Sequence, residues 1–212
     1  MTVEVTVYSD YVCPYCLLAE GVIEKALAGK DVDVRWRPFE LRPEPAATLR
    51  PEDDYLPRVW ADSVYPMARR LGVSIVLPKV SPQPYTHTAF EGFLFADEQG
   101  RGREYNNRVF RAFFQDQQDI GRVDVLTAVA ASIGLDADGF RAALTDRRHR
   151  QAHRLALRHA VDVVGVRVVP TIIVGEGRIE GVPDAGQLTA MVDRLLSDDR
   201  SHASPADAPA HR

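Results

Sequence analysis

The sequence predicts an α/β protein whose sheet-forming parts are separated by a large all-helical insertion. Three observations lead to this fold class. Residues 3–41 have the pattern of a strand, a helix and a second strand, and residues 57–164 carry helical periodicity. A β-branched run, "VRVVPTIIV", then returns with a further short strand and a closing helix. A chain of 212 residues is long enough for one core that carries such an insertion.

The first unit is a strand, a helix and a strand in close succession. "TVEVTVYS" alternates valine with polar residues and is typical of a strand. From Pro14 to about Ala28, apolar residues recur at helical spacing, and Gly29 is expected to end the helix. "VDVRWRPFEL" has the pattern of a second strand. A right-handed crossover and a parallel strand pair are therefore expected.

The predicted insertion follows a proline-rich loop at 42–56. "YLPRVWADSVYPMARRLG" indicates a helix that is broken at Pro66, because proline removes a helical hydrogen bond. Two amphipathic helices should follow, closing near Gly100 and Gly121, and then a helical hairpin over 123–146 and a helix over 149–165.

The chain is expected to end in a hairpin, a helix and a tail. Gly175 and Gly177 in "GEG" suit a tight turn that needs positive φ. The last helix should begin at Pro183 or Asp184. Residues 198–212 lack periodicity and large apolar residues, which predicts disorder. The predicted domains are thus 1–41 joined with 165–197, an inserted domain at 57–164, and a disordered tail at 198–212.

Composition and termini limit the classes of function. A net charge of −4 argues against nucleic acid as a partner, because phosphate backbones need a clustered basic face. No apolar run is long enough to span a bilayer, and the N-terminus has no secretory signal pattern, so we expect a cytoplasmic protein without membrane association. A structural disulfide is not expected in the cytoplasm, whereas a catalytic dithiol is allowed.

The two cysteines of the chain lie three positions apart in "VYSDYVCPYCLLAEGVIEKAL". Cys13 falls where the loop after the first strand meets the helix, and Cys16 follows one turn later. The partial positive charge and free N–H groups of the helix start favour a thiolate at Cys13. Cys16 can then attack a mixed disulfide formed at Cys13 and release the substrate. Pro14 suits the first turn, where its missing N–H is not needed.

The two cysteines have two other interpretations. They could be small buried hydrophobic residues without chemistry. They could also form half of a zinc site with His149 and His153, which are four residues apart on the last inserted helix. The distance in sequence is far greater than in a zinc finger, and His153 shares a face with apolar residues, so a packed histidine is the better interpretation. No metal is therefore expected.

Pro170 is a second signal, because proline removes a hydrogen-bond donor from a strand. It suits the start of a strand beside a functional site, with a cis bond between Val169 and Pro170. In that geometry the backbone of Val169 is free to pair with an extended peptide. A trans proline at a strand start is the alternative.

Together these residues resemble the thioredoxin superfamily. In this chain the similar motifs are "CPYC" after the first strand and "VVPT" before the third. The size and the helical insertion are similar to the DsbA family, and more closely to its cytosolic FrnE-like branch. Similar segments extend from Val3 to about Leu196 and include "SPQPYTHTAFEGFLFADEQG", "VFRAFFQDQQDIG" and "VLTAVAASIGLD". The resemblance implies a thioredoxin-like fold and thiol–disulfide oxidoreductase activity.

The resemblance also implies the roles of individual residues. Cys13 would be the nucleophile and Cys16 the resolving thiol, with Pro170 as a cis-proline facing them. Pro14 and Tyr15, between the cysteines, would tune the redox potential. The implied partners are dithiol or disulfide proteins and small thiols, with no bound cofactor and with glutathione as a candidate redox partner. A homodimer is left open.

The chain departs from the family at several positions. Val168 stands where the branch commonly has glycine, and Ile172 stands where it has phenylalanine. Two other functions therefore stay open on the same scaffold. One is a kappa-class-like isomerase or glutathione-dependent enzyme, although such enzymes usually carry serine in place of Cys13. The other is a chaperone-like binding module that works through its aromatic residues.

Further residues near the cysteines are candidates for a substrate rim: Asp10, Tyr11 and Phe90. Asp10 could accept a proton or cap the following helix. Phe90 belongs to a set of six phenylalanines on two neighbouring predicted helices. A groove for substrate is one interpretation of this set, and the core of the insertion is the favoured one. The set is Phe90, Phe93, Phe95, Phe110, Phe113 and Phe114.

Overall fold

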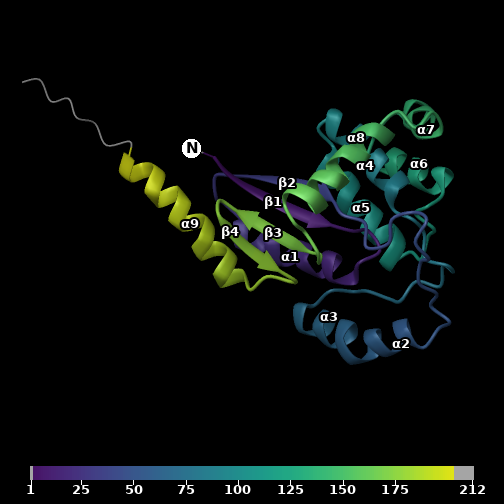
Figure 1. Ribbon diagram of the computed structural model, residues 1–212, viewed down its shortest axis with the longest axis horizontal. Coiled ribbons are helices and arrows are strands. Elements are labelled where there is room, and N and C mark those ends of the chain that lie inside the picture. The colour runs from purple at the N-terminus through teal and green to yellow at the C-terminus, as the bar shows by residue number, and fades with distance from the viewer. Residues whose placement is uncertain (1, 203–212) are drawn as a thin grey trace, which may run out of the picture.

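The structure, a computed structural model, describes residues 2–202, with side chains described as far as residue 198 (Figure 1). It confirms the predicted α/β class. A four-stranded sheet has the order β2-β1-β3-β4. Its strands are β1 (Val3–Ser9), β2 (Val32–Pro38), β3 (Thr171–Val174) and β4 (Gly177–Glu180). Strands from both ends of the chain therefore form one sheet.

β1 lies at the centre of the sheet between partners from distant parts of the sequence. It runs parallel to β2, with Val7 opposite Trp36, and antiparallel to β3, with Val7 opposite Ile172. The parallel pair confirms the expected crossover unit, and α1 (Pro14–Leu27) is its helix. Gly29 follows with φ of 73°, as its place after a helix predicts.

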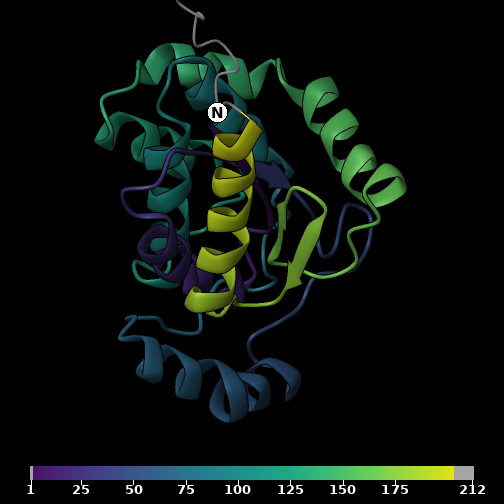
Figure 2. The same ribbon diagram turned by 90° about the vertical axis from the view of Figure 1, so that its left-hand side faces the viewer.

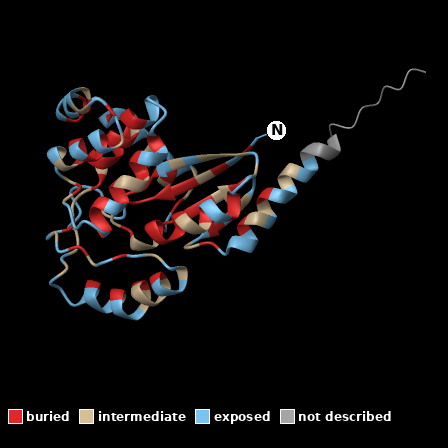
Figure 3. Cartoon of the chain, turned by 180° about the vertical axis from the view of Figure 1, so that it is seen from behind, coloured by how far each residue is buried: buried red, intermediate tan, exposed pale blue. Residues whose placement is uncertain are grey.

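Alternation along the strands divides the core into two parts. Val5, Val7 and Ile172 point to the face that α1 and α9 (Ala185–His202) cover. Tyr8 and Ile173 belong instead to a larger core that the inserted helices share with the sheet. Figure 3 shows buried residues, in red, both in the sheet and on the inserted helices.

The insertion consists of helices that cover one end of the sheet, as Figures 1 and 2 show. In both views α2 and α3 lie apart from the other inserted helices, beyond one end of α1. The helices are α2 (Tyr55–Val59), α3 (Tyr65–Leu71), α4 (His87–Glu98), α5 (Gly102–Phe114), α6 (Val123–Ser132), α7 (Ala137–Thr145) and α8 (Arg150–Arg158). Among the described residues, no helix is both long and apolar enough to cross a membrane.

Several local predictions for the insertion are confirmed. The first helix is broken as expected: a π-helical turn, Trp60–Val64, separates α2 from α3, and Pro66 stands in the first turn of α3. α6 and α7 pack together as a hairpin. All six phenylalanines of the predicted set are buried, so the favoured interpretation, the core of the insertion, is confirmed.

Two local expectations are wrong. α5 ends at Phe114 instead of near Gly121, and Gln117 just after it has φ of 54°, which no helix accommodates. In the hairpin turn Gly175 has φ of 57°, but Gly177 is an ordinary strand residue. Its missing Cβ instead makes room for the Met191 side chain, which a Cβ would meet.

The predicted disordered tail lies only partly within the described residues. α9 continues to His202, so residues 198–202 are helical. The helix is anchored upstream, where the Thr189 hydroxyl donates to the Ala26 carbonyl at 3.2 Å. Once such a helix is nucleated, each further residue adds a hydrogen bond without needing an apolar contact. Residues 203–212 lie outside the described residues.

Candidate functional site

The two cysteines lie at the start of α1. Cys13 precedes the helix as its N-cap residue, with the Cys13 amide donating to the Asp10 carbonyl at 3.0 Å. Cys16 lies in the first turn, and its amide donates to the Cys13 carbonyl at 3.1 Å. Both thiols are free and buried: Cys13 is 4% exposed and Cys16 is 0% exposed. A substrate can therefore reach the site only at the edge of the Cys13 side chain.

The segment before β3 faces the first cysteine. The Cys13 Sγ donates to the Val169 carbonyl at 3.5 Å, across 156 positions of sequence. The Val169–Pro170 peptide bond is cis, as are Glu44–Pro45 and Ser81–Pro82. The Pro170 carbonyl accepts from the Gly181 amide at 2.8 Å, which attaches this segment to the end of β4. The sheet thus brings the two sequence signals, the cysteine pair and Pro170, to one place.

The Cys16 thiol does not ionise readily. Burial raises the pKa of the Cys16 thiol well above its usual value, and the neighbouring Cys13 thiol raises it further. A contact with the Asp10 backbone opposes this and lowers the pKa of Cys16. Cys16 is thus held as a neutral thiol, and a base must take its proton before it can attack a disulfide.

Asp10 is part of the interior and joins three segments. Its side chain accepts from the Leu41 amide at 2.7 Å and from the Val12 amide at 3.5 Å. It also bonds to the side chain of Thr86, which precedes α4. It does not cap α1, which has no side-chain cap. Burial raises the pKa of Asp10 to about 6, although the hydrogen bonds to Leu41 and Thr86 lower it.

Asp10→Asn is expected to change how stability depends on pH. The folded-state pKa of Asp10, about 6, lies above its ordinary value of 3.8, so the folded chain holds the proton more tightly than the unfolded chain. The free energy of unfolding should therefore fall by roughly 3 kcal/mol as pH rises from about 4 to 6. In the variant the Asp10 share of this decline should be absent, which urea denaturation at a series of pH values measures.

Glu20→Gln is the matched control for this prediction. Burial also raises the pKa of Glu20, to about 8, so the Glu20 contribution declines over a higher range, from about 4.5 to 8. The two contributions overlap between about pH 4.5 and 6, but only that of Glu20 continues to decline from about pH 6 to 8, so only Glu20→Gln should change the curve there. An Asp10→Asn curve that runs parallel to the wild type between pH 4 and 6 would contradict the assignment to Asp10.

The three residues predicted to form a substrate rim are buried in the structure. Asp10, Tyr11 and Phe90 are at most 5% exposed. Tyr11 lies between two aromatic rings, with its centroid 4.6 Å from that of Phe90 and 5.1 Å from that of Phe110. The residues are near the cysteines in sequence, but the loop turns them inward, where α4 and α5 supply an apolar environment.

Tyr15 connects the cysteine motif to the separate helices α2 and α3. Its hydroxyl donates to the Ser63 Oγ at 2.7 Å, and Ser63 lies in the π-helical turn Trp60–Val64. Sequence reasoning did not find Ser63, because no pattern links a serine inside a helix to a tyrosine 48 positions away. The turn is an irregular helix of the kind that often accompanies functional sites.

Tyr15→Phe is expected to loosen α2 and α3 without unfolding the chain. The variant loses one partly buried hydrogen bond, worth about 0.5–1.5 kcal/mol. Amides in residues 55–71 should then exchange with deuterium faster, by roughly three- to tenfold. Ser63→Ala removes the same bond from the other side and should give the same exchange pattern. Unchanged exchange in both variants would show that the bond does not hold this segment.

The histidines weighed as zinc ligands lie in other environments. His153 is 2% exposed, and its Nε2 is 2.7 Å from Glu40 Oε1. His149 Nδ1 is 3.6 Å from Glu98 Oε1. Each histidine thus has a carboxylate partner of its own. His153 is a packed residue, as its position among apolar residues predicted.

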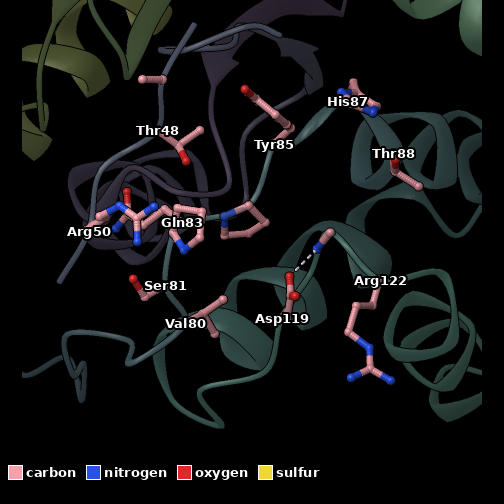
Figure 4. Close-up of a pocket in the computed structure, with 14 residues that line it drawn as sticks. Thr48, Arg50, Val80, Ser81, Gln83, Tyr85, His87, Thr88, Asp119 and Arg122 are labelled. Atoms are coloured by element: carbon pink, nitrogen blue, oxygen red, sulfur yellow. Dashed lines mark hydrogen bonds between the residues drawn. The ribbon is translucent and has the colours of Figure 1, made fainter. Parts of the chain in front are cut away.

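A separate cavity of about 560 Å³ lies between the segments that precede α4 and the loop that joins α5 to α6 (Figure 4). Arg50, His87 and Asp119 line it, but neither cysteine does. Asp119 already accepts from the Gly121 amide at 2.9 Å, drawn as a dashed line in Figure 4. The cavity is therefore distinct from the dithiol site.

Comparison with known proteins agrees with this geometry. The family model of the DsbA-like thioredoxin domain matches residues 4–195. The chain belongs to the DsbA-like thioredoxin domain family. This DsbA-like chain is also 47% identical over 201 residues to the Bacillus subtilis (strain 168) protein described as "Uncharacterized protein YwbO", covering 94% of this chain and 98% of that one.

Solved structures share the fold of this DsbA-like chain at lower identity. A probable DsbA oxidoreductase from Streptomyces coelicolor has a TM-score of 0.75 at 24% identity, covering 98% of this chain and 94% of that one. A 2-hydroxychromene-2-carboxylate isomerase has a TM-score of 0.74 at 19% identity, with 95% and 100% covered. The cytosolic disulfide reductase DsbM from Pseudomonas aeruginosa, solved with glutathione, has a TM-score of 0.67 at 19% identity, with 93% and 99% covered.

Proposed function

We propose that this chain is a dithiol–disulfide oxidoreductase with Cys13 as nucleophile and Cys16 as resolving thiol. The observation that carries the proposal is the placement of Cys13 at the start of α1, facing the Val169 carbonyl, with Cys16 one turn further in. Membership of the DsbA-like family supports the class of reaction. Pro14 and Tyr15 are proposed to tune the reduction potential, and the Val169–Pro170 segment to shape the face that receives the substrate.

The reaction follows from the different environments of the two thiols. The Cys13 thiolate attacks a substrate disulfide, so that a Cys13–substrate bond forms as the substrate S–S bond breaks, and the departing thiolate takes a proton. Cys16 then gives up its proton and attacks the Cys13 sulfur. The Cys13–Cys16 disulfide forms, the second substrate thiolate leaves, and two electrons have passed to the substrate. The reverse sequence oxidises a substrate dithiol.

Asp10 is proposed as the acceptor of the Cys16 proton. A buried carboxyl whose pKa lies near 6 is ionised at neutral pH and can still hold a proton briefly. The Asp10 backbone already contacts the Cys16 thiol, which keeps the carboxyl in the vicinity of that thiol. The reaction then needs no cofactor beyond the two cysteines.

Glutathione is the proposed small-thiol partner, and the cytoplasm is the proposed compartment. The Pseudomonas aeruginosa structure with glutathione supports both, since its description calls that protein a cytosolic reductase. Protein dithiols and disulfides remain the other class of substrate. A homodimer is compatible with this function but is not required by it, because both thiols come from one chain.

The test is the equilibrium of the protein with a glutathione redox buffer, read by mass after alkylation. We expect an intramolecular Cys13–Cys16 disulfide. A potential of about −270 mV would make the chain a reductase, and one between about −180 and −120 mV would make it an oxidant or isomerase of disulfides. No intramolecular disulfide at any ratio of oxidised to reduced glutathione would overturn the proposal.

An isomerase acting on a small molecule is the second candidate. The structural likeness to 2-hydroxychromene-2-carboxylate isomerase favours it. The two functions differ in their need for the dithiol. If isomerisation of that carboxylate occurs and survives the change Cys16→Ser, the second candidate is supported, because such a reaction does not need a resolving thiol.

A further inference from the structure

α8 carries a concentration of positive charge that the redox chemistry does not use. Arg150, Arg154 and Arg158 recur every four residues and so lie on one side of the helix, and Arg147 and Arg148 precede them. These five residues are called the arginine face below. The chain as a whole has a net charge of −4, so general composition does not explain the cluster. Figure 2 shows α8, in green, along the outer edge of the helical segment.

Most of the arginine face lacks a partner. Within the described part of the chain, Arg147 pairs with Glu91, whereas the other four side chains make no ion pair or hydrogen bond. α8 has no side-chain cap and no acidic residue in its first turn. Cations four residues apart repel each other, and a cation at a helix start also opposes the helix dipole. An anion bound from outside would relieve both effects.

The arginine face lines two adjoining cavities. The outer hollow, of about 590 Å³, is lined only by the five arginines and Gln151. The inner pocket, of about 240 Å³, shares Arg147, Arg150 and Arg154 with it and is also lined by His153 and by the carboxylates of Glu40, Glu44 and Glu91. A concave surface of this kind suits a small ligand.

His153 supplies a second, independent sign of a ligand. It is 2% exposed and lines the inner pocket, yet its buried Nδ1 has no hydrogen-bond partner. Its ring is fixed on the other side, where Nε2 is 2.7 Å from Glu40 and the ring stacks on Phe90 with centroids 5.5 Å apart. A buried polar atom without a partner is costly, and in the tautomer with the ring proton on Nδ1 an oxygen of a ligand in the pocket would accept from it.

We propose that the arginine face and the inner pocket bind a small molecule with at least two oxyanion groups, phosphate or carboxylate. Arg150 and Arg154 are one turn apart, about 6 Å along the helix, which sets the spacing of the two groups. Arginine suits both chemistries, because its planar fork binds either oxyanion through paired hydrogen bonds. His153 donates to the innermost oxygen from Nδ1 in the tautomer that carries the ring proton on that nitrogen. Glu40 and Glu44 line the same pocket and keep a long polyanion from entering it.

The test is calorimetric titration of the full chain with pyrophosphate, and separately with succinate. We expect one site per chain that weakens as salt is added. The double variant Arg150→Gln/Arg154→Gln should lose affinity by roughly tenfold or more. The matched control is Arg69→Gln/Arg70→Gln on α3, which removes the same charge elsewhere and should bind as the wild type does. Binding of pyrophosphate alone or of succinate alone decides between the two chemistries.

Nitrogen-15 NMR spectra of the histidine rings distinguish binding in the inner pocket from general charge attraction, which would not change the chemical shift of one buried ring nitrogen. The Nδ1 resonance of His153 should shift at saturation, while that of His159, outside the cavity lining, should not. The proposal is overturned if neither ligand binds, if both double variants weaken binding equally, or if only heparin or single-stranded DNA binds. None of these outcomes bears on disulfide exchange at Cys13, which is measured separately.

Discussion

Cys13→Ser is expected to abolish disulfide exchange, and Cys16→Ser is expected to trap its intermediate. Serine is a far weaker nucleophile than a thiolate, so the rate of reduction of a substrate disulfide should fall by at least about three orders of magnitude in Cys13→Ser. In Cys16→Ser the first attack still occurs, but no thiol remains to release the product. Incubation with oxidised glutathione should then give a stable adduct at Cys13, read by its added mass.

The two variants also show which of the two cysteines attacks the substrate disulfide first. Cys16 is 0% exposed and its burial raises its pKa, so Cys13→Ser should react with glutathione and with alkylating agents slowly. If Cys13→Ser forms the adduct and Cys16→Ser does not, the assigned roles are reversed. If neither variant forms an adduct while both remain folded, the redox proposal itself fails. Circular dichroism of each variant supplies the folding control.

The parts of the fold that follow from local pattern could be predicted from the sequence. The alternation around Val5 and Val7 identified β1, and the glycine at Gly29 identified the end of α1. The spacing of Cys13 and Cys16 at a strand-to-helix junction led to the dithiol, because position and residue type together carry that chemistry. In each case the cause lies within a few residues of the effect.

The parts that depend on tertiary packing could not be predicted in the same way. Asp10 and Tyr11 look like surface loop residues, and only the packing of α4 and α5 buries them. The Tyr15–Ser63 bond and the Glu40–His153 pair join residues 48 and 113 positions apart. A single sequence contains no signal for such pairs. The short run "DRRHR", which includes Arg147, has the composition of a solvated face, yet Arg147 is the partner of a buried carboxylate.

Arg147→Ala is expected to destabilise the fold by about 3–5 kcal/mol, because it leaves a buried charge without a partner. The Glu91 side chain is 0% exposed, and the Arg147 guanidinium donates three hydrogen bonds to it, at 2.6, 2.9 and 3.1 Å. Arg147 has φ of 52°, but alanine carries the same Cβ, so the backbone cost is equal in both chains and cancels. Urea denaturation at neutral pH measures the loss.

A double variant separates the buried charge from the lost packing. Glu91→Gln/Arg147→Ala has no charge at this position, so it should be more stable than Arg147→Ala alone, even though it carries one more substitution. The deficit of Arg147→Ala should also shrink as the solution is acidified, because protonation neutralises the stranded carboxyl. A double variant that is less stable than the single one, with a deficit independent of pH, would mean that Arg147 acts through packing of its side chain. The predicted order of stabilities follows from the cost of an unpaired buried carboxylate, which exceeds that of a neutral amide in the same place.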